Sequence, residues 1–288
     1  MSGIVLSLIL GTATPGGGFP VYGDAYAEML NAQEPRIRIE TRNTKGSTEN
    51  VPLLEAGKLD LGLVAGELAS VALARPGTQL RIVAAMYSSP GMFVVKADSP
   101  VRRIADLKDK PVVLGTQGSG ITVLGRLVLS SLEIKITELT LEKAADGPPM
   151  LQDGRAAALW GAGVGWPAFT ALAKAGGRFV GPDAEEVKRI LAKNPSLQAT
   201  TLPAKSYPGQ DAPINSVGSW SYVFARPGLP EEQAYLLARA LHRAEGPFAS
   251  RLDQAKESTA ANIVAASPRP DLIHPGAQKY LREAGLLR

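Results

Sequence analysis

The sequence predicts an α/β fold made of two lobes that are joined by two crossing strands. Strand-like apolar runs alternate with segments of helical spacing along the chain, which is typical of α/β sheets. A unit of strand, glycine-rich loop and helix occurs twice, about a hundred residues apart. At 288 residues the chain is also long enough for two domains of ordinary size.

The first lobe begins with a continuous apolar run over residues 4–10, as expected for a parallel strand covered on both faces. Residues 20–31 have helical spacing, with Val21, Ala25 and Leu30 on one face. The elements that follow are a strand over 36–41, a helix that starts at 51, and strands over 59–64 and 80–86.

The second lobe begins with PVVLGTQGSG over 111–120, followed by an apolar helix over 121–132. Before it, the strand in MFVVKADSP is followed by Asp98-Ser99-Pro100. Proline disfavours helix at the residue before it, so Ser99 is the expected exit from the first lobe. A similar strand, WSYVFA over 220–225, comes late. We therefore expect these two strands to cross between the lobes, with residues 1–98 and 216–288 in the first and 99–215 in the second.

Composition excludes several classes of protein. There are 31 Lys and Arg against 27 Asp and Glu, and 6% of residues are aromatic. Because no basic run concentrates this charge, nucleic acid is not the expected partner. Cysteine is absent and no apolar stretch reaches membrane-spanning length. No signal peptide precedes the first strand, so we expect either a cytosolic protein or a mature form without its leader.

Three loops are suited to bind an anion. The first, GTATPGGGFPVYG, is not a phosphate-binding P-loop, because Gly17 and Gly18 stand where that motif has Lys and Ser or Thr. The second, GTQGSG over 115–120, has a glycine spacing that is too common to identify a ligand by itself. Both loops, and NTKGSTEN over 43–50 with Ser47 or Thr48 as helix cap, lead to helix N-termini, whose free N–H groups attract anions. Together they predict a carboxylate ligand, although each loop alone is equally explained by turn geometry.

Catalytic motifs are missing from the sequence. The two histidines, His242 and His274, stand beside no cysteine, and neither G-x-S-x-G nor H-E-x-x-H occurs. Asp60 and Asp106 are expected in turns or at helix ends. We therefore expect no enzyme activity, no catalytic residues, no metal site and no cofactor.

Several segments together resemble one known family, the TAXI solute receptors of TRAP transporters. They are TKGSTENVPLLEAGKLDLGLVAGE, LRIVAAMYSSPGMFVVKADSPVRRIADLKDKPVVLGTQGSG, MLQDGRAAALWGAGVGWPAF and LIHPGAQKYLREAGL, and they keep the family's order over nearly the whole chain. The resemblance implies a monomeric type II periplasmic binding protein. It further implies a cleft between the lobes that closes on a small carboxylate, such as glutamate, a dicarboxylate or an aromatic acid, and a TRAP-type membrane permease as partner.

The resemblance also implies a set of ligand contacts. In the first lobe these are Thr12, Thr14, Gly17, Gly18, Phe19, Tyr22, Lys45, Ser47, Asn50 and Tyr87. In the second lobe they are Thr116, Gly118, Ser119, Gly120, Thr122, Gly163 and Trp166. Lys45 is either a counter-charge for the carboxylate or a solvated lysine, and Trp166 either lines the cleft or belongs to the core.

Two other interpretations stay open. A binding protein for an ABC importer, of the thiamine-precursor, nitrate or sulfonate type, would share the fold and differ in its membrane partner. A transferase that uses the glycine loop for a phosphorylated substrate is the less favoured alternative.

Overall fold

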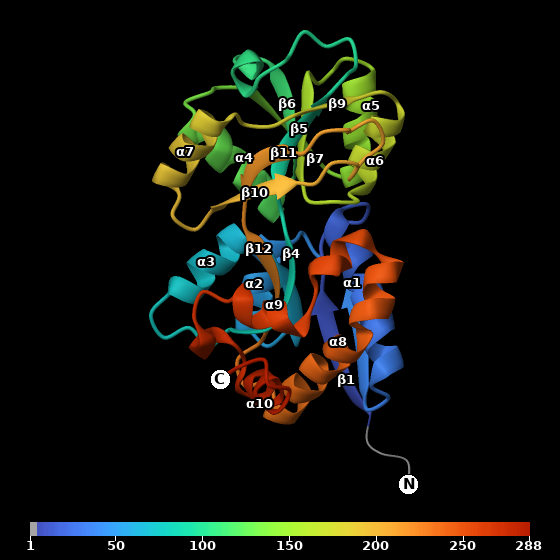
Figure 1. Ribbon diagram of the computed structural model, residues 1–288, viewed down its shortest axis with the longest axis vertical. Coiled ribbons are helices and arrows are strands. Elements are labelled where there is room, and N and C mark those ends of the chain that lie inside the picture. Colours follow the sequence, from blue (N-terminus) through green and yellow to red (C-terminus); the bar gives the residue numbers. More distant parts are fainter. Residues whose placement is uncertain (1–4) are drawn as a thin grey trace. The chain divides into compact units, whose positions relative to one another are not determined.

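Two five-stranded sheets and one two-stranded sheet organise residues 5–288, the part of the chain that the computed structural model describes (Figure 1). The chain divides into two units. Unit 1 consists of the described residues up to Ala13, Phe19–Tyr87 and Trp220–Arg288, and unit 2 of Thr14–Gly18 and Ser88–Ser219. Both large sheets are mixed and carry helices, so the predicted α/β fold is confirmed. Ile4, where the first strand is expected to start, lies outside the described residues.

The sheet of unit 1 has the order β2-β1-β3-β12-β4. β1 (Leu6–Gly11) pairs in parallel with β2 (Ile37–Arg42) and β3 (Leu61–Val64). β12 (Trp220–Ala225) runs antiparallel to β3, and β4 (Arg81–Ser88) is at the edge. Every residue of β3 is buried, as its unbroken apolar sequence predicts, whereas β2 alternates and buries only its two isoleucines.

Helices cover the sheet of unit 1. They are α1 (Gly18–Gln33), α2 (Ser47–Glu55), α3 (Gly66–Ala74), α8 (Glu231–Arg251), α9 (Ala260–Ala265) and α10 (Pro275–Glu283), with 3₁₀ turns η3 (Asp253–Glu257) and η4 (Pro270–Leu272). The expected apolar face of α1 is wrong at Val21, which is 38% exposed. Tyr22 and Tyr26 are fully buried instead, and their rings lie 5.3 and 6.2 Å from Phe248.

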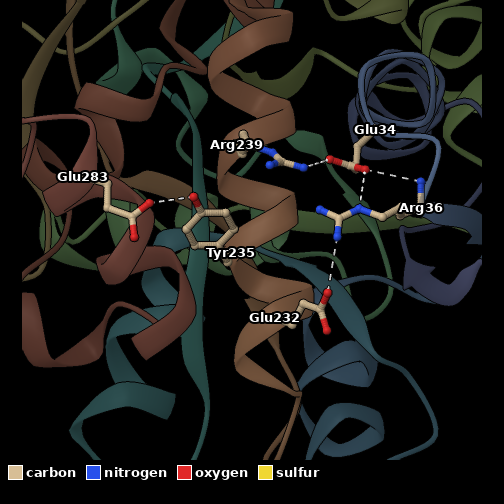
Figure 2. A network of polar contacts seen from close by, with 6 residues as sticks. All are labelled: Glu34, Arg36, Glu232, Tyr235, Arg239 and Glu283. Carbon is tan, nitrogen blue, oxygen red and sulfur yellow. Dashed lines mark hydrogen bonds and ion pairs between the residues drawn. The ribbon is translucent and has the colours of Figure 1, made fainter. Parts of the chain in front are cut away.

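An ionic network ties α1 and β2 to α8 within unit 1 (Figure 2). The buried carboxylate of Glu34 accepts hydrogen bonds from Arg239 of α8 and from Arg36, whose Nε lies 3.1 Å from Glu34 Oε1. Arg36 also pairs with Glu232 of α8 at 3.4 Å. Burial alone would raise the pKa of Glu34, but the hydrogen bonds from the two arginines outweigh it and lower the pKa below its ordinary value.

The sheet of unit 2 has the order β7-β6-β8-β5-β9. β6 (Pro111–Thr116) is parallel to β7 (Thr137–Leu141) and β8 (Ala158–Ala162), whereas β5 (Gly91–Val95) is antiparallel to β8 and β9 (Arg178–Val180). A separate antiparallel pair joins β10 (Gln198–Leu202) to β11 (Ile214–Gly218). The helices are α4 (Gly120–Ser131), α5 (Gly147–Gln152), α6 (Pro167–Lys174) and α7 (Ala184–Lys193), with 3₁₀ turns η1 (Ile104–Leu107) and η2 (Ala144–Asp146).

The observed boundary between the units differs from the expected one. We expected the first lobe to extend to residue 98, but β5 pairs with β8 and β9, and the chain passes into unit 2 between Tyr87 and Ser88. Gly91 explains why β5 fits there, because a Cβ on it would lie 2.4 Å from the ring of the buried Trp160. The chain returns to unit 1 after Ser219, so residues 216–219 of the expected first lobe also belong to unit 2. Thr14–Gly18, which was expected in the first lobe, belongs to unit 2 as well.

Candidate functional site

In unit 1 the carboxyl ends of three parallel strands meet at one edge of the sheet. From β1 the chain goes to β2 on one side and later to β3 on the other, so the strand order reverses next to β1. In α/β sheets ligands bind outside the carboxyl ends of the strands at such a switch point. The loop after β1 and the loop after β2 both leave from this edge.

Unit 2 repeats this topology. From β6 the chain goes to β7 on one side and then to β8 on the other, and all three strands are parallel. The loops that follow β6 and β8 therefore leave from the same edge of this sheet. They contain the second set of expected ligand contacts, from Thr116 to Thr122 and from Gly163 to Trp166.

The loop between β1 and α1 exposes main-chain donors. Gly16 has a φ of 84°, which favours glycine, and Gly17 N–H donates to Thr14 O at 3.3 Å. The structure gives no hydrogen-bond partner among the described residues to the N–H groups of Gly18 and Phe19, which begin α1. All of these residues are at least partly exposed. The dipole of this 16-residue helix adds positive potential at the same place.

The loop between β2 and α2 is braced by its own side chains. Asn50 is fully buried, and its Nδ2 lies 2.8 Å from both Thr12 O and Leu63 O. Its Oδ1 accepts from Thr44 Oγ1 at 2.8 Å. Ser47 does not cap α2 as expected, because the helix begins at this residue and its Oγ accepts from Ala65 N–H at 3.0 Å. These polar groups hold the ends of the strands in position.

Other expected contacts in unit 1 have different surroundings. The buried Thr12 hydroxyl donates to Arg42 O at 3.2 Å. Lys45 is exposed, and its backbone N–H donates to Glu49. Tyr22 lies in the core with its hydroxyl 2.9 Å from Ser258 Oγ, and burial raises its pKa far above the ordinary value. Tyr87 is 5% exposed and packs edge-on against Tyr22.

The loop between β6 and α4 offers a second set of main-chain donors. Ser119 precedes the helix without capping it through its side chain, and the N–H groups of Gly120 and Ile121 have no partner among the described residues. Thr122 is buried and donates its hydroxyl to Leu114 O and Thr116 O at 3.2 and 3.1 Å. Thr122 therefore shapes the loop. Gly118, with a φ of 84°, completes the turn.

The loop between β8 and α6 is held by a tyrosine that the sequence did not single out. Tyr207 donates its hydroxyl to Gly163 O at 2.9 Å and accepts from Trp166 N–H at 3.1 Å. Trp166 is 8% exposed and its ring lies 4.7 Å from that of Phe169. Trp166 was expected either to line the cleft or to belong to the core, and its burial against Phe169 agrees with a place in the core. The sequence gives no signal for Tyr207, because its rings of contact, Phe169 and Phe179, come together only in the tertiary structure.

Groups suited to metal binding are not gathered in the described part of the chain. No group of three or more His, Asp or Glu that could hold a metal occurs in residues 5–288. His274 caps α10 by accepting from Gly276 N–H, and His242 Nδ1 lies 2.8 Å from the Tyr280 hydroxyl. Asp106 accepts from two backbone N–H groups before η1, as expected of a turn residue.

A family model matches this sequence and fold over most of the chain. The model of the NMT1-like family matches residues 10–285. The chain belongs to the NMT1-like family. This family is a periplasmic solute-binding protein type, which confirms the expected class. The narrower assignment to TAXI receptors is not supported, and the match agrees better with the alternative of an ABC-importer binding protein.

Solved structures of binding proteins have the same fold as this NMT1-like chain. MatC from Rhodopseudomonas palustris, with bound malate, has a TM-score of 0.61 at 16% identity and covers 98% of this chain and 97% of its own. The periplasmic aliphatic sulphonate binding protein SsuA from Escherichia coli has a TM-score of 0.56 at 19% identity, covering 96% and 83%. The periplasmic binding protein BugD has a TM-score of 0.62 at 12% identity, covering 100% and 99%.

These likenesses support the type II two-lobed fold for the NMT1-like chain. Among the described residues, none of the helices is both long enough and apolar enough to span a bilayer. Solute-binding proteins, the type to which the NMT1-like family belongs, deliver small ligands to membrane transporters.

Proposed function

We propose that this protein captures a small organic acid, preferably a carboxylate, and delivers it to a membrane importer. The observation that carries the proposal is the pair of switch-point edges, one in each unit. Each edge presents the N-terminus of a long helix, α1 or α4, whose first N–H groups have no partner among the described residues. Such helix starts bind anions without a charged side chain.

The solved structures of the same fold agree with an acidic ligand. MatC was solved with malate, and SsuA is a binding protein for aliphatic sulphonates. Malate and sulphonates are both small acids whose oxygens accept hydrogen bonds from N–H groups. We propose that this chain grips its acid through the amides near Thr14–Phe19 and Ser119–Ile121, with the partly exposed Ser119 hydroxyl as a further donor.

In the proposed mechanism the acid binds one conformation of the protein more tightly than the others. The acid shifts the population toward that conformation by this difference in affinity. The importer distinguishes the acid-bound conformation from the free one.

The membrane partner in this proposal is an ABC-type importer. The NMT1-like match favours it over the TRAP-type permease implied by the TAXI resemblance. Reconstitution with each transporter type tests this choice. Stimulated uptake with the TRAP-type permease alone would overturn the ABC assignment and leave acid binding untouched.

A ligand screen by thermal unfolding tests the acid. A ligand at 100 times its Kd stabilises the native state by about 2.7 kcal/mol. We expect malate, glutamate, benzoate or an alkanesulfonate to raise the Tm, and calorimetry with a carboxylate to show one site. If none of the acids raised the Tm, this proposal would fail. Stabilisation by sugar phosphates or nucleotides that Ser119→Trp abolishes would then favour the transferase alternative, which uses the glycine loop.

The variant Ser119→Trp tests the site itself. A tryptophan here fills the approach to the amides of Gly120 and Ile121, so we expect acid binding to be abolished while the circular dichroism spectrum stays unchanged. Ser130→Trp, at the exposed C-terminal end of the same helix, is the matched control and retains full affinity. Equal affinity in the two variants would exclude the loop after β6 from the site.

A further inference from the structure

Unit 1 contains a cavity of about 550 Å³ that the proposed function does not use. It lies where α3 ends, beside the first residue of β4 and the segment around η4. Its volume is in the range of small-molecule sites. Its wall includes Leu73, Arg75, Thr78, Arg81, Arg269 and Leu272.

Backbone pairing builds the walls of this cavity. After α3 the chain turns at Gly77, which has a φ of 75°, and Thr78 N–H donates to Arg75 O at 3.2 Å. Next in sequence to the lining residues Arg81 and Leu272, Ile82 pairs with Ile273 in a parallel bridge, and His274 N–H donates to Ile82 O at 2.8 Å. The cavity is therefore framed by fixed main chain, although loops form much of its surface.

Three arginines give the cavity its charge, and Asp271 is the acidic residue among its lining. Arg81 is half-buried and donates from Nη1 to Thr78 O and Leu80 O at 3.0 and 2.8 Å. The structure pairs Arg81 with no carboxylate among the described residues, and no partner is found there for its Nε or Nη2. Its charge is thus held in place by carbonyls and left uncompensated.

The other two arginines are held by exposed ion pairs. Arg75 pairs with Glu55 at 2.9 Å and Arg269 pairs with Asp271 at 3.1 Å. The side chains in both pairs are 40% exposed or more, and such pairs contribute little to stability. Both guanidinium groups can therefore exchange a carboxylate partner for a ligand at low cost.

We propose that this cavity is a second ligand site, which binds a tetrahedral oxyanion such as a phosphoryl group. Three guanidinium groups from separate segments suit the several oxygens and double charge of phosphate better than the two coplanar oxygens of one carboxylate. Leu73 and Leu272 give the cavity an apolar wall beside the charged one. The site takes either free phosphate or a small phosphorylated molecule with an apolar part.

Binding of inorganic phosphate and phenyl phosphate at low ionic strength tests the site. The titrations use the Ser119→Trp background, so that the proposed acid site does not contribute. We expect saturable phosphate binding by calorimetry and by ³¹P line broadening, and at least a tenfold higher Kd in Arg81→Gln. Arg38→Gln, an exposed arginine of β2, is the control and leaves the Kd unchanged. Tighter binding of phenyl phosphate identifies a phosphorylated organic ligand, and equal binding identifies free phosphate.

Two results would overturn the second site. The first is no saturable binding up to ~10 mM phosphate, which corresponds to a standard binding free energy weaker than about −3 kcal/mol. The second is equal Kd values for phosphate in Arg81→Gln and Arg38→Gln. Because Arg81 also bonds to the backbone, Arg269→Gln at an exposed position is the second variant, and it raises the Kd without affecting the fold. Acid binding in Arg81→Gln with Ser119 intact separates the proposals. If only the oxyanion site is wrong, this variant still binds the acid. If the proposed function is wrong, the variant does not bind the acid.

Discussion

The side chain of Asn50 joins the ends of β1 and β3 through its amide group, and Thr44 holds its carbonyl oxygen. Gly11 is adapted to it, because a Cβ there would lie 2.7 Å from Asn50 Oδ1. The residue thus sets the spacing of the strand ends from which the loops emerge. Its contribution to binding is structural in this arrangement.

Replacing Asn50 by alanine tests this bracing. The change removes a hydrogen-bond donor from the buried carbonyls of Thr12 and Leu63, so we expect the free energy of unfolding to fall by about 3 kcal/mol. Urea unfolding measures it. Lys45→Ala, at an exposed position in the same loop, changes the free energy by less than about 0.5 kcal/mol. Similar losses in both variants would contradict the bracing role of Asn50.

His274 gives the stability of unit 1 a dependence on pH. Burial lowers its pKa below the ordinary 6.5, with Arg81 acting in the same direction and Leu229 O and Glu231 opposing it. Because the folded pKa lies below the unfolded one, the unfolded state binds more protons below about pH 6.5. Stability is therefore fully present above the unfolded pKa and is lost as the pH falls toward the folded pKa.

The variant His274→Asn removes this titration and keeps a side chain that can cap α10. We expect the wild type to lose more free energy of unfolding than the variant does when the pH falls from 7.5 to 5.5. Denaturant titrations at both values measure the two slopes. Parallel pH profiles would show that His274 titrates equally in the folded and unfolded chain.

At the scale of the element, the loop after β6 depends on an irregularity in its strand. The register of β6 with β7 shifts between Val113 and Gly115, and Gly115 has a φ of 129°. A Cβ at Gly115 would lie 2.8 Å from Thr122 Oγ1. The strand therefore needs glycine here to turn its end toward α4.

Gly115→Ala should destabilise unit 2 by about 2 kcal/mol or more, because it combines backbone strain with a steric clash. Gly154→Ala is the matched control, since Gly154 also has a positive φ of 83° but nothing within 4 Å of the added Cβ. We expect that control to lose only about 1 kcal/mol. Urea unfolding compares the two variants. Equal losses of unfolding free energy would show that backbone strain alone, without the clash against Thr122, destabilises Gly115→Ala.

The network in Figure 2 links α8 to the start of β2 through a buried carboxylate. Arg239→Gln removes one of the two arginines of Glu34, and we expect a loss of about 2–4 kcal/mol at pH 7. Arg251→Gln on the same helix breaks an exposed pair with Glu28 and costs less than about 0.5 kcal/mol. Because the pKa of Glu34 is lowered, the difference between the variants shrinks as the pH falls below about 4.5. A difference that is equally large at pH 3.5 would argue against the ion pair.

At the scale of the whole molecule, the sequence predicts the α/β class and most parallel strands, because runs such as that of β3 are buried on both faces. Gly23 explains the wrong face of α1: a Cβ there would lie 2.5 Å from Thr12, so the helix approaches β1 through its small residues. The sheet of β5 was not predictable, since an apolar run fits either sheet. β10 and β11 were missed because each mixes polar with apolar residues.

The candidate site was predictable as a set of loops but not as a set of side chains. Glycines and helix starts mark the loops directly in the sequence, whereas the direction of a polar side chain depends on the tertiary structure. Asn50, Thr122 and Tyr22 have polar groups that turn inward to neighbouring strands or helices. From the sequence alone, a polar residue beside a glycine loop is therefore equally consistent with a contact to the ligand and with a hydrogen bond inside the protein.

Free amides at the starts of α1 and α4 have no proton to lose or gain between pH 5 and 9. A grip built from them keeps the same charge across that interval. The affinity for an acid should then follow the acid's own dissociation constant, so that a weak acid leaves the protein when it takes up a proton, whatever the state of the protein's side chains.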